Sequence, residues 1–141
     1  MLNPNSNYLE KEVLQASPID QILLLYNKAL TSLKMVKSVI EKPSLTPEEV
    51  KIKAEALSKA VDILIYLKAV LDHEKGGQVA KNLDEIYGIL IEELVRFNFS
   101  NDTKVLNDTI EILDNMKKAW QDIRGGITFQ RPIGKAQTKA F

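Results

Sequence analysis

Apolar residues recur every three or four positions along most of this chain, which is the spacing of amphipathic helices. The first such segment begins at Ser17, where serine, proline and an early aspartate are typical of a helix start, and extends to about Glu41. A second begins at Thr46, where Thr46-Pro47-Glu48-Glu49 has the order of a capping box, and extends to about Lys75. No stretch alternates with period two, so no sheet is expected.

A double glycine, Gly76-Gly77, separates the second helical segment from a third, which runs from about Gln78 to about Phe97. It predicts the turn of a tight helical hairpin. Residues 98–102 then supply a turn and a cap for a fourth segment that reaches about Arg124. Because the links are short, successive helices should be antiparallel. The sequence therefore predicts an all-α fold, an up-down-up-down four-helix bundle over 17–124, with an N-terminal arm or cap helix at 1–16 and a flexible basic tail at 125–141.

The predicted helices carry more apolar surface than one bundle interior needs. A bundle helix requires about three apolar positions in seven, whereas residues 60–67 are apolar almost all round. Such stripes are usually core, and the inner stripes are assigned to it. For the surplus face of the second helix, core and interface fit about equally well. As an interface it would be a groove for an amphipathic partner helix, and the N-terminal arm is a candidate to cover it. The candidate contact residues of the bundle are Ile22, Leu25, Tyr26, Ile63, Tyr66, Leu67 and Tyr87.

The three tyrosines of this set, Tyr26, Tyr66 and Tyr87, have two interpretations. As contact residues they would form flat, rigid walls of the groove. As ordinary core-edge residues they would keep a hydrated hydroxyl.

The charge balance does not indicate a polyanionic partner. Lys and Arg number 19, as do Asp and Glu, so the net charge is zero. The tail from Gly125 holds three of the bases and no acid, which leaves 16 bases against 19 acids in the body. Nucleic acid is therefore not expected as a partner. The apolar segment 60–71 is interrupted by Asp62 and Lys68, and the N-terminus lacks signal-peptide features, so we expect no membrane insertion and a cytoplasmic location.

The sequence offers little for catalysis. There is no cysteine and His73 is the single histidine, so zinc and di-iron sites lack ligands, and no metal or cofactor is expected. One enzyme-like alternative is a histidine-phosphotransfer bundle, because His73-Glu74-Lys75-Gly76 approximates a His-x-x-Lys-Gly setting one position too close together. The competing interpretation is a solvated histidine that interacts with the last carbonyls of its helix.

Three groups of residues together resemble the FliS family, the flagellin-specific export chaperones of the bacterial flagellum. The groups are Tyr8–Pro18 leading into Ile22–Tyr26; Leu71-Asp72-x-Glu74-x-Gly76-Gly77 with Ala80, Asn82, Leu83 and Tyr87; and Asn101-Asp102 with Leu106 and Ala119-Trp120. Their order and spacing carry the resemblance, which covers about residues 5–124. The chain departs from the family pattern at Gln21 and at Asn27-Lys28.

The resemblance implies a non-enzymatic, ATP-independent export chaperone of the cytosol. Such a protein binds the C-terminal helical region of flagellin, prevents premature polymerisation and keeps flagellin competent for flagellar type III secretion. Export-gate components of that system are further expected partners. By the same resemblance the arm residues Tyr8, Leu9 and Val13 are candidates for contact with flagellin or the export machinery, and the arm is a candidate to guard an empty groove.

Overall fold

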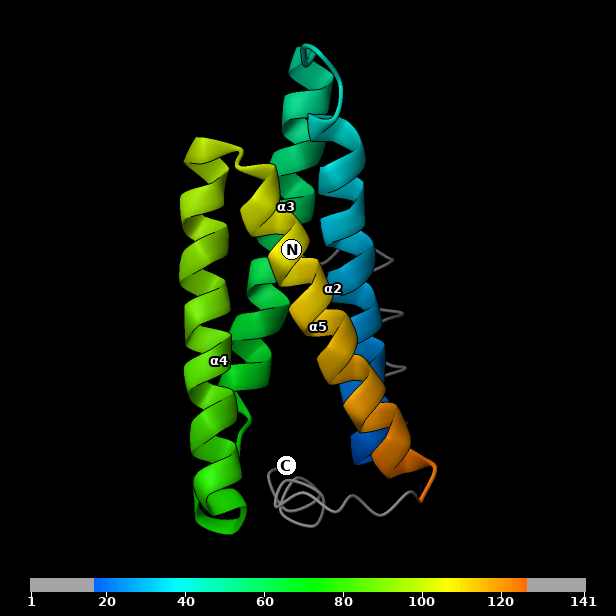
Figure 1. Cartoon of the computed structure of the whole chain (residues 1–141), viewed down its shortest axis with the longest axis vertical. Coiled ribbons are helices and arrows are strands. Elements are labelled where there is room, and N and C mark those ends of the chain that lie inside the picture. Colours follow the sequence, from blue (N-terminus) through cyan, green and yellow to red (C-terminus); the bar gives the residue numbers. More distant parts are fainter. Residues whose placement is uncertain (1–16, 127–141) are drawn as a thin grey trace, which may run out of the picture.

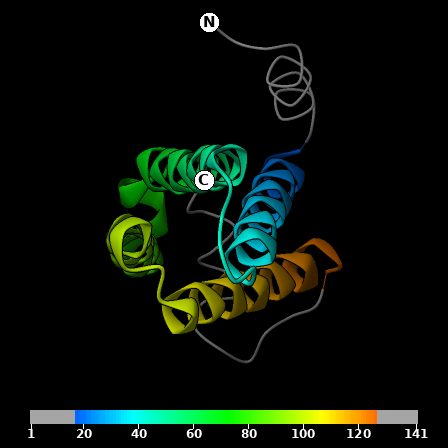
Figure 2. The ribbon, with the colours of Figure 1, turned by 90° about the horizontal axis from the view of Figure 1, so that it is seen from above.

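The computed structural model describes residues 17–126, and within that range the chain forms four α-helices and no strand. The helices are α2 (Pro18–Ile40), α3 (Pro47–Ala69), α4 (His73–Ser100) and α5 (Thr103–Arg124). Successive helices run in opposite directions (Figure 1), and seen from above they form a ring in the order α3, α2, α5, α4 (Figure 2). The predicted all-α up-down-up-down four-helix bundle is confirmed. The arm at 1–16 and the tail from residue 127 lie outside the described residues.

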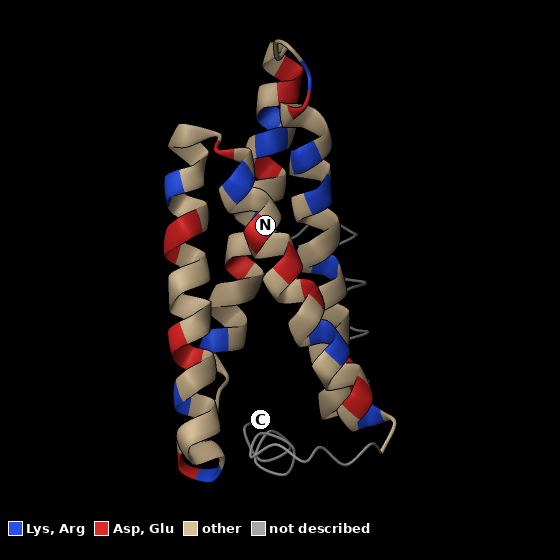
Figure 3. Cartoon of the chain, viewed as in Figure 1, with Lys and Arg blue, Asp and Glu red and all other residues tan. Residues whose placement is uncertain are grey.

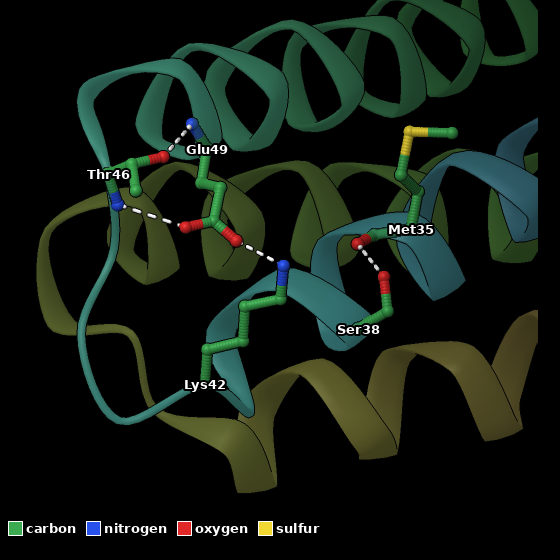
Figure 4. A network of polar contacts seen from close by, with 5 residues as sticks. All are labelled: Met35, Ser38, Lys42, Thr46 and Glu49. Carbon is green, nitrogen blue, oxygen red and sulfur yellow. Dashed lines mark hydrogen bonds and ion pairs between the residues drawn. The ribbon is translucent and has the colours of Figure 1, made fainter.

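Helices α2, α3 and α5 begin where the sequence predicted, because each of these starts carries a local cap. The Ser17 hydroxyl accepts a hydrogen bond from the Asp20 amide at 3.3 Å, with Pro18 in the first turn. At α3 the Thr46 hydroxyl accepts from the Glu49 amide at 3.1 Å, and the Glu49 carboxylate accepts from the Thr46 amide at 3.0 Å. Figure 4 shows this capping box, with Lys42 paired to the same carboxylate.

The hairpin between α3 and α4 corrects the predicted boundary. α3 ends at Ala69 rather than near Lys75, and the chain reverses over residues 70–72. The reason is that Asp72 caps a new helix, because its carboxylate accepts from the Lys75 amide at 2.9 Å. The double glycine marks a break inside α4, where Gly77 has φ 51° and ψ −127°, and the continuous part of α4 follows it. The predicted helix start at about Gln78 therefore agrees with this continuous part.

The four helices enclose an apolar core, and charges of both signs are interspersed along their outer surfaces (Figure 3). The largest fully buried side chains include Trp120, Tyr26, Tyr87 and Phe97. α4 and α5 diverge toward the end of the bundle that holds the beginning of α4 and the end of α5 (Figure 1). They pack against each other less than the other neighbouring helices of the ring do. The core is therefore tightest around α2.

Candidate partner-binding site

A groove of about 1020 Å³ opens on the surface between α2 and α3. Helical periodicity builds it, because residues spaced three or four apart on each helix share the edge that faces the other helix. Three of the predicted contact residues line it, namely Leu25, Ile63 and Tyr66. Leu25 and Ile63 are buried at its floor, whereas the Tyr66 side chain is 48% exposed. The structure thus brings these three together at one surface site.

The rim of this α2–α3 groove mixes apolar and charged groups. Met35 and Ile52 extend its apolar lining, and Met35 is as exposed as Tyr66. Lys28 from α2 and Lys59 from α3 also line it. Burial lowers the pKa of Lys59, and the neighbouring ammonium group of Lys28 lowers it further. The groove therefore combines an apolar floor with charged residues of both signs, since Glu55 and Asp62 line it as well.

A second groove, of about 310 Å³, lies between α4 and α5 where the two helices diverge. It is lined by Val79, Asn82, Leu83, Ile86, Asn115, Met116, Ala119 and Trp120. Helical periodicity does not predict this groove, because the apolar members of its lining also fit the core stripes of α4 and α5. No sequence signal distinguishes a core stripe from a groove wall here, since the groove arises from the angle between the two helices.

A third hollow, of about 300 Å³, lies between α3 and the end of α4. Its lining includes Val61, Val95 and Phe99, and the Phe99 ring is 84% exposed. Beside it, the ammonium group of the buried Lys53 donates a hydrogen bond to the carbonyl of Asn98 at 3.3 Å and so ties α3 to the end of α4. Phe99 was not among the predicted contact residues, although an exposed aromatic ring on a helix end is a signal for one.

Tyr26 and Tyr87 lie inside the bundle rather than on a groove wall. Their hydroxyl oxygens are 2.6 Å apart, so one hydroxyl donates to the other, and both side chains are almost fully buried. The Trp120 indole also hydrogen-bonds Tyr26, and Met116 Sδ lies 3.9 Å from the same hydroxyl. Burial raises the pKa of Tyr26 to about 12 and that of Tyr87 well above its usual value. The expectation of hydrated hydroxyls at these two residues is wrong.

The remaining predicted contact residues divide between the core and the undescribed arm. Ile22 and Leu67 are buried, so like Tyr26 and Tyr87 they present little surface in this conformation. Tyr8, Leu9 and Val13 lie outside the described residues. Direct contact between any of these seven residues and a partner stays a prediction.

His73 occupies the first turn of α4, ahead of the break at Gly77. The predicted interaction with the last carbonyls of a helix is therefore wrong, because His73 lies at a helix N-terminus. This position also gives the phosphotransfer alternative no support. Within residues 17–126 no group of three or more His, Cys, Asp or Glu side chains could hold a metal ion. None of the four described helices has the length and apolar composition needed to cross a membrane.

Comparison with known proteins shows the family to which this chain belongs. Residues 1–126 match the family described as "Flagellar protein FliS". The chain belongs to the FliS family. It is 37% identical over 123 residues to the flagellar secretion chaperone FliS of Salmonella typhimurium, covering 86% of this chain and 87% of the relative.

Two further relatives agree. The flagellar secretion chaperone FliSB of Pseudomonas aeruginosa is 34% identical over 115 residues, 82% of this chain and 87% of the relative. The flagellar secretion chaperone FliS of Vibrio cholerae is 33% identical over 115 residues, 82% of this chain and 81% of the relative. The resemblance found in the sequence is thereby confirmed, and the bundle belongs to a family of flagellar secretion chaperones.

Proposed function

We propose that this protein is a cytoplasmic, non-enzymatic chaperone that binds the C-terminal helical region of flagellin. It prevents premature polymerisation and keeps flagellin competent for flagellar type III secretion. The family of flagellar secretion chaperones supports the general role. The proposed binding site is the α2–α3 groove, because its apolar floor and exposed Tyr66 offer a surface for an amphipathic helix.

The dimensions of the α2–α3 groove fit a helical segment better than a small molecule. Its lining extends along α3 from Ile52 to Tyr66, which at a helical rise of 1.5 Å per residue is roughly 20 Å. A partner helix of about four turns would cover that length. A segment that is disordered before binding loses conformational entropy when it folds onto the groove, so a long contact is needed to offset the loss. The second groove between α4 and α5 offers further apolar surface to the same partner.

The N-terminal arm, residues 1–16, is the second part of the proposed binding surface. We propose that Tyr8, Leu9 and Val13, outside the described residues, contact flagellin or an export-gate component. Removal of residues 1–16 should then change either the affinity for flagellin or the efficiency of export. Unchanged affinity and unchanged export in the truncated protein would remove the arm from the site.

The site can be tested by calorimetric titration of the full chain with a peptide spanning the C-terminal region of flagellin from the same genome. We expect a saturable complex with a negative heat-capacity change, because apolar surface is buried. Replacing the half-exposed Tyr66 with alanine should weaken binding by about tenfold or more, the loss typical of an aromatic anchor. Ile89→Ala is the matched control, since Ile89 is 59% exposed on α4 and lines none of the three grooves. Absence of binding by the parent protein would refute the proposal.

A further inference from the structure

Two lysines face each other in the α2–α3 groove. Lys28 comes from the middle of α2 and Lys59 from the middle of α3, both are partly buried, and both line the groove. Their ammonium groups are close enough that Lys28 affects the ionisation of Lys59. Among residues 17–126, neither lysine forms an ion pair with a carboxylate. The fold therefore holds two like charges together at a partly desolvated site.

The two acidic residues of the groove lining, Glu55 and Asp62, form no ion pair with Lys28 or Lys59. Glu55 lines the groove but pairs with Lys51 at 4.0 Å. Asp62 also lines it, is exposed, and forms no ion pair with a described residue. Two facing ammonium groups repel each other, and the repulsion grows as water is excluded. A carboxylate placed between them would accept a charge-assisted hydrogen bond from each.

Apolar groups flank the lysines along both helices. Because α2 and α3 are antiparallel (Figure 1), Leu25, one turn before Lys28, and Ile63 and Tyr66, one and two turns after Lys59, lie on the same side of the lysines along the groove. Met35, two turns after Lys28, and Ile52, two turns before Lys59, lie on the other side. A helix lying in the groove would thus meet apolar contacts on both sides of a positive centre. This order of contacts can select among partner helices. A partner with an apolar residue at the central position would leave both ammonium groups desolvated and unpaired.

We propose that the α2–α3 groove selects a partner helix that carries an Asp or Glu side chain within its apolar face, seated between Lys28 and Lys59. The acid of the partner is flanked by apolar residues at helical spacing on each side, which contact Leu25, Ile63 and Tyr66 toward one end of the groove and Met35 and Ile52 toward the other. The inference rests on the proposed function and specifies the chemistry that the groove recognises in the flagellin segment.

The test uses the full chain and the C-terminal flagellin peptide at low and high salt. Lys28→Gln/Lys59→Gln should lower the affinity on the order of tenfold, as expected when a charge-assisted hydrogen bond is lost, and should weaken its salt dependence. The control is Lys75→Gln/Lys81→Gln, which removes the same charge from two exposed positions on α4. The groove variant should fold at least as stably as the parent because it relieves a repulsion, and thermal unfolding of the free protein checks this.

A set of peptides identifies the carboxylate. Acids of the peptide are replaced one at a time by their amides, and one replacement should weaken binding to the parent but have little effect on Lys28→Gln/Lys59→Gln. Unchanged affinity of the lysine variant, with Tyr66→Ala still impaired, would overturn this inference and leave the proposed function standing. If amidation of the peptide's terminal carboxylate, and no replacement of a side-chain acid, weakens binding in this way, the inference is overturned as well. The carboxylate between the lysines would then be the chain end and not an Asp or Glu side chain. Absence of binding by the parent protein would instead refute the proposed function.

Discussion

The hydroxyl pair of Tyr26 and Tyr87 should contribute measurably to stability, and the two residues should do so unequally. The two hydroxyls are 2.6 Å apart in the core and link α2 to α4. Tyr26 also receives a hydrogen bond from the Trp120 indole of α5, so three helices meet at its hydroxyl. Among the described residues, Tyr26 is the one hydrogen-bond partner found for the Tyr87 hydroxyl. This asymmetry sets the expected order of the two phenylalanine variants.

Tyr26→Phe deprives the Tyr87 hydroxyl of its partner and removes an acceptor of Trp120. A buried polar group left without a partner costs about 1–3 kcal/mol, and we expect this variant to fall in the upper half of that range. Tyr87→Phe should fall in the lower half, because the Tyr26 hydroxyl still accepts from Trp120. The double variant leaves no unpaired tyrosine hydroxyl, so its loss should be smaller than the sum of the single losses by about 1 kcal/mol.

Urea unfolding at equilibrium, followed by helical circular dichroism, gives the four free energies of unfolding that the cycle needs. Tyr66→Phe is the control, since it removes a hydroxyl from a half-exposed side chain and should leave the free energy unchanged. Strict additivity of the two core substitutions would show that the hydroxyls do not interact. A larger loss for Tyr87→Phe than for Tyr26→Phe would refute the role assigned to Trp120.

Two further predictions concern the backbone and pH. Gly77→Ala should destabilise the protein by about 1–3 kcal/mol, because a backbone with φ 51° and ψ −127° is strained for alanine. Gly88→Ala in mid-helix should stabilise the protein, because the added Cβ meets only Lys68 Cε at an ordinary contact distance of 3.5 Å. Denaturant unfolding compares the two variants, and equal effects would contradict this expectation. The pKa of Glu49 is lowered from 4.5 to about 2, chiefly by Lys42, so its stabilisation is present above pH 4.5 and lost as pH falls toward 2. Glu49→Gln should therefore flatten the pH dependence of stability over that interval, and an unchanged profile would contradict this.

Helix starts could be predicted from the sequence because their signals act within one turn. Ser17, Thr46 and Asp102 each cap a helix with a side-chain oxygen that accepts from a backbone amide two or three residues later. The end of α3 could not be predicted in the same way. Asp72 and Gly77 are both local signals, and each is compatible with a chain reversal. Packing of α3 on α4 decides between them, and that packing depends on residues far apart in the sequence.

The candidate site was predictable only in part for the same reason. Helical spacing together with the antiparallel order of α2 and α3 brings Leu25, Ile63 and Tyr66 to one groove. Tyr26 belongs to the inner stripe of α2, so periodicity alone favours the core, as the structure shows. The α4–α5 groove depends on the angle at which these helices diverge, and the apolar pattern of either helix is the same whether they touch or separate. Its discovery required the structure.

The positions of the two main grooves bear on the kind of partner that can use both. In the ring of helices, the α2–α3 edge and the α4–α5 edge lie at opposite corners (Figure 2). A single straight helix can occupy one of them but cannot reach the other, because the core lies between them. A segment that is disordered before binding can pass around the bundle and fold into each groove in turn. A pre-assembled helical partner cannot do so without first coming apart. The geometry therefore favours unassembled chains over assembled ones, which is the discrimination that a chaperone of secretion needs.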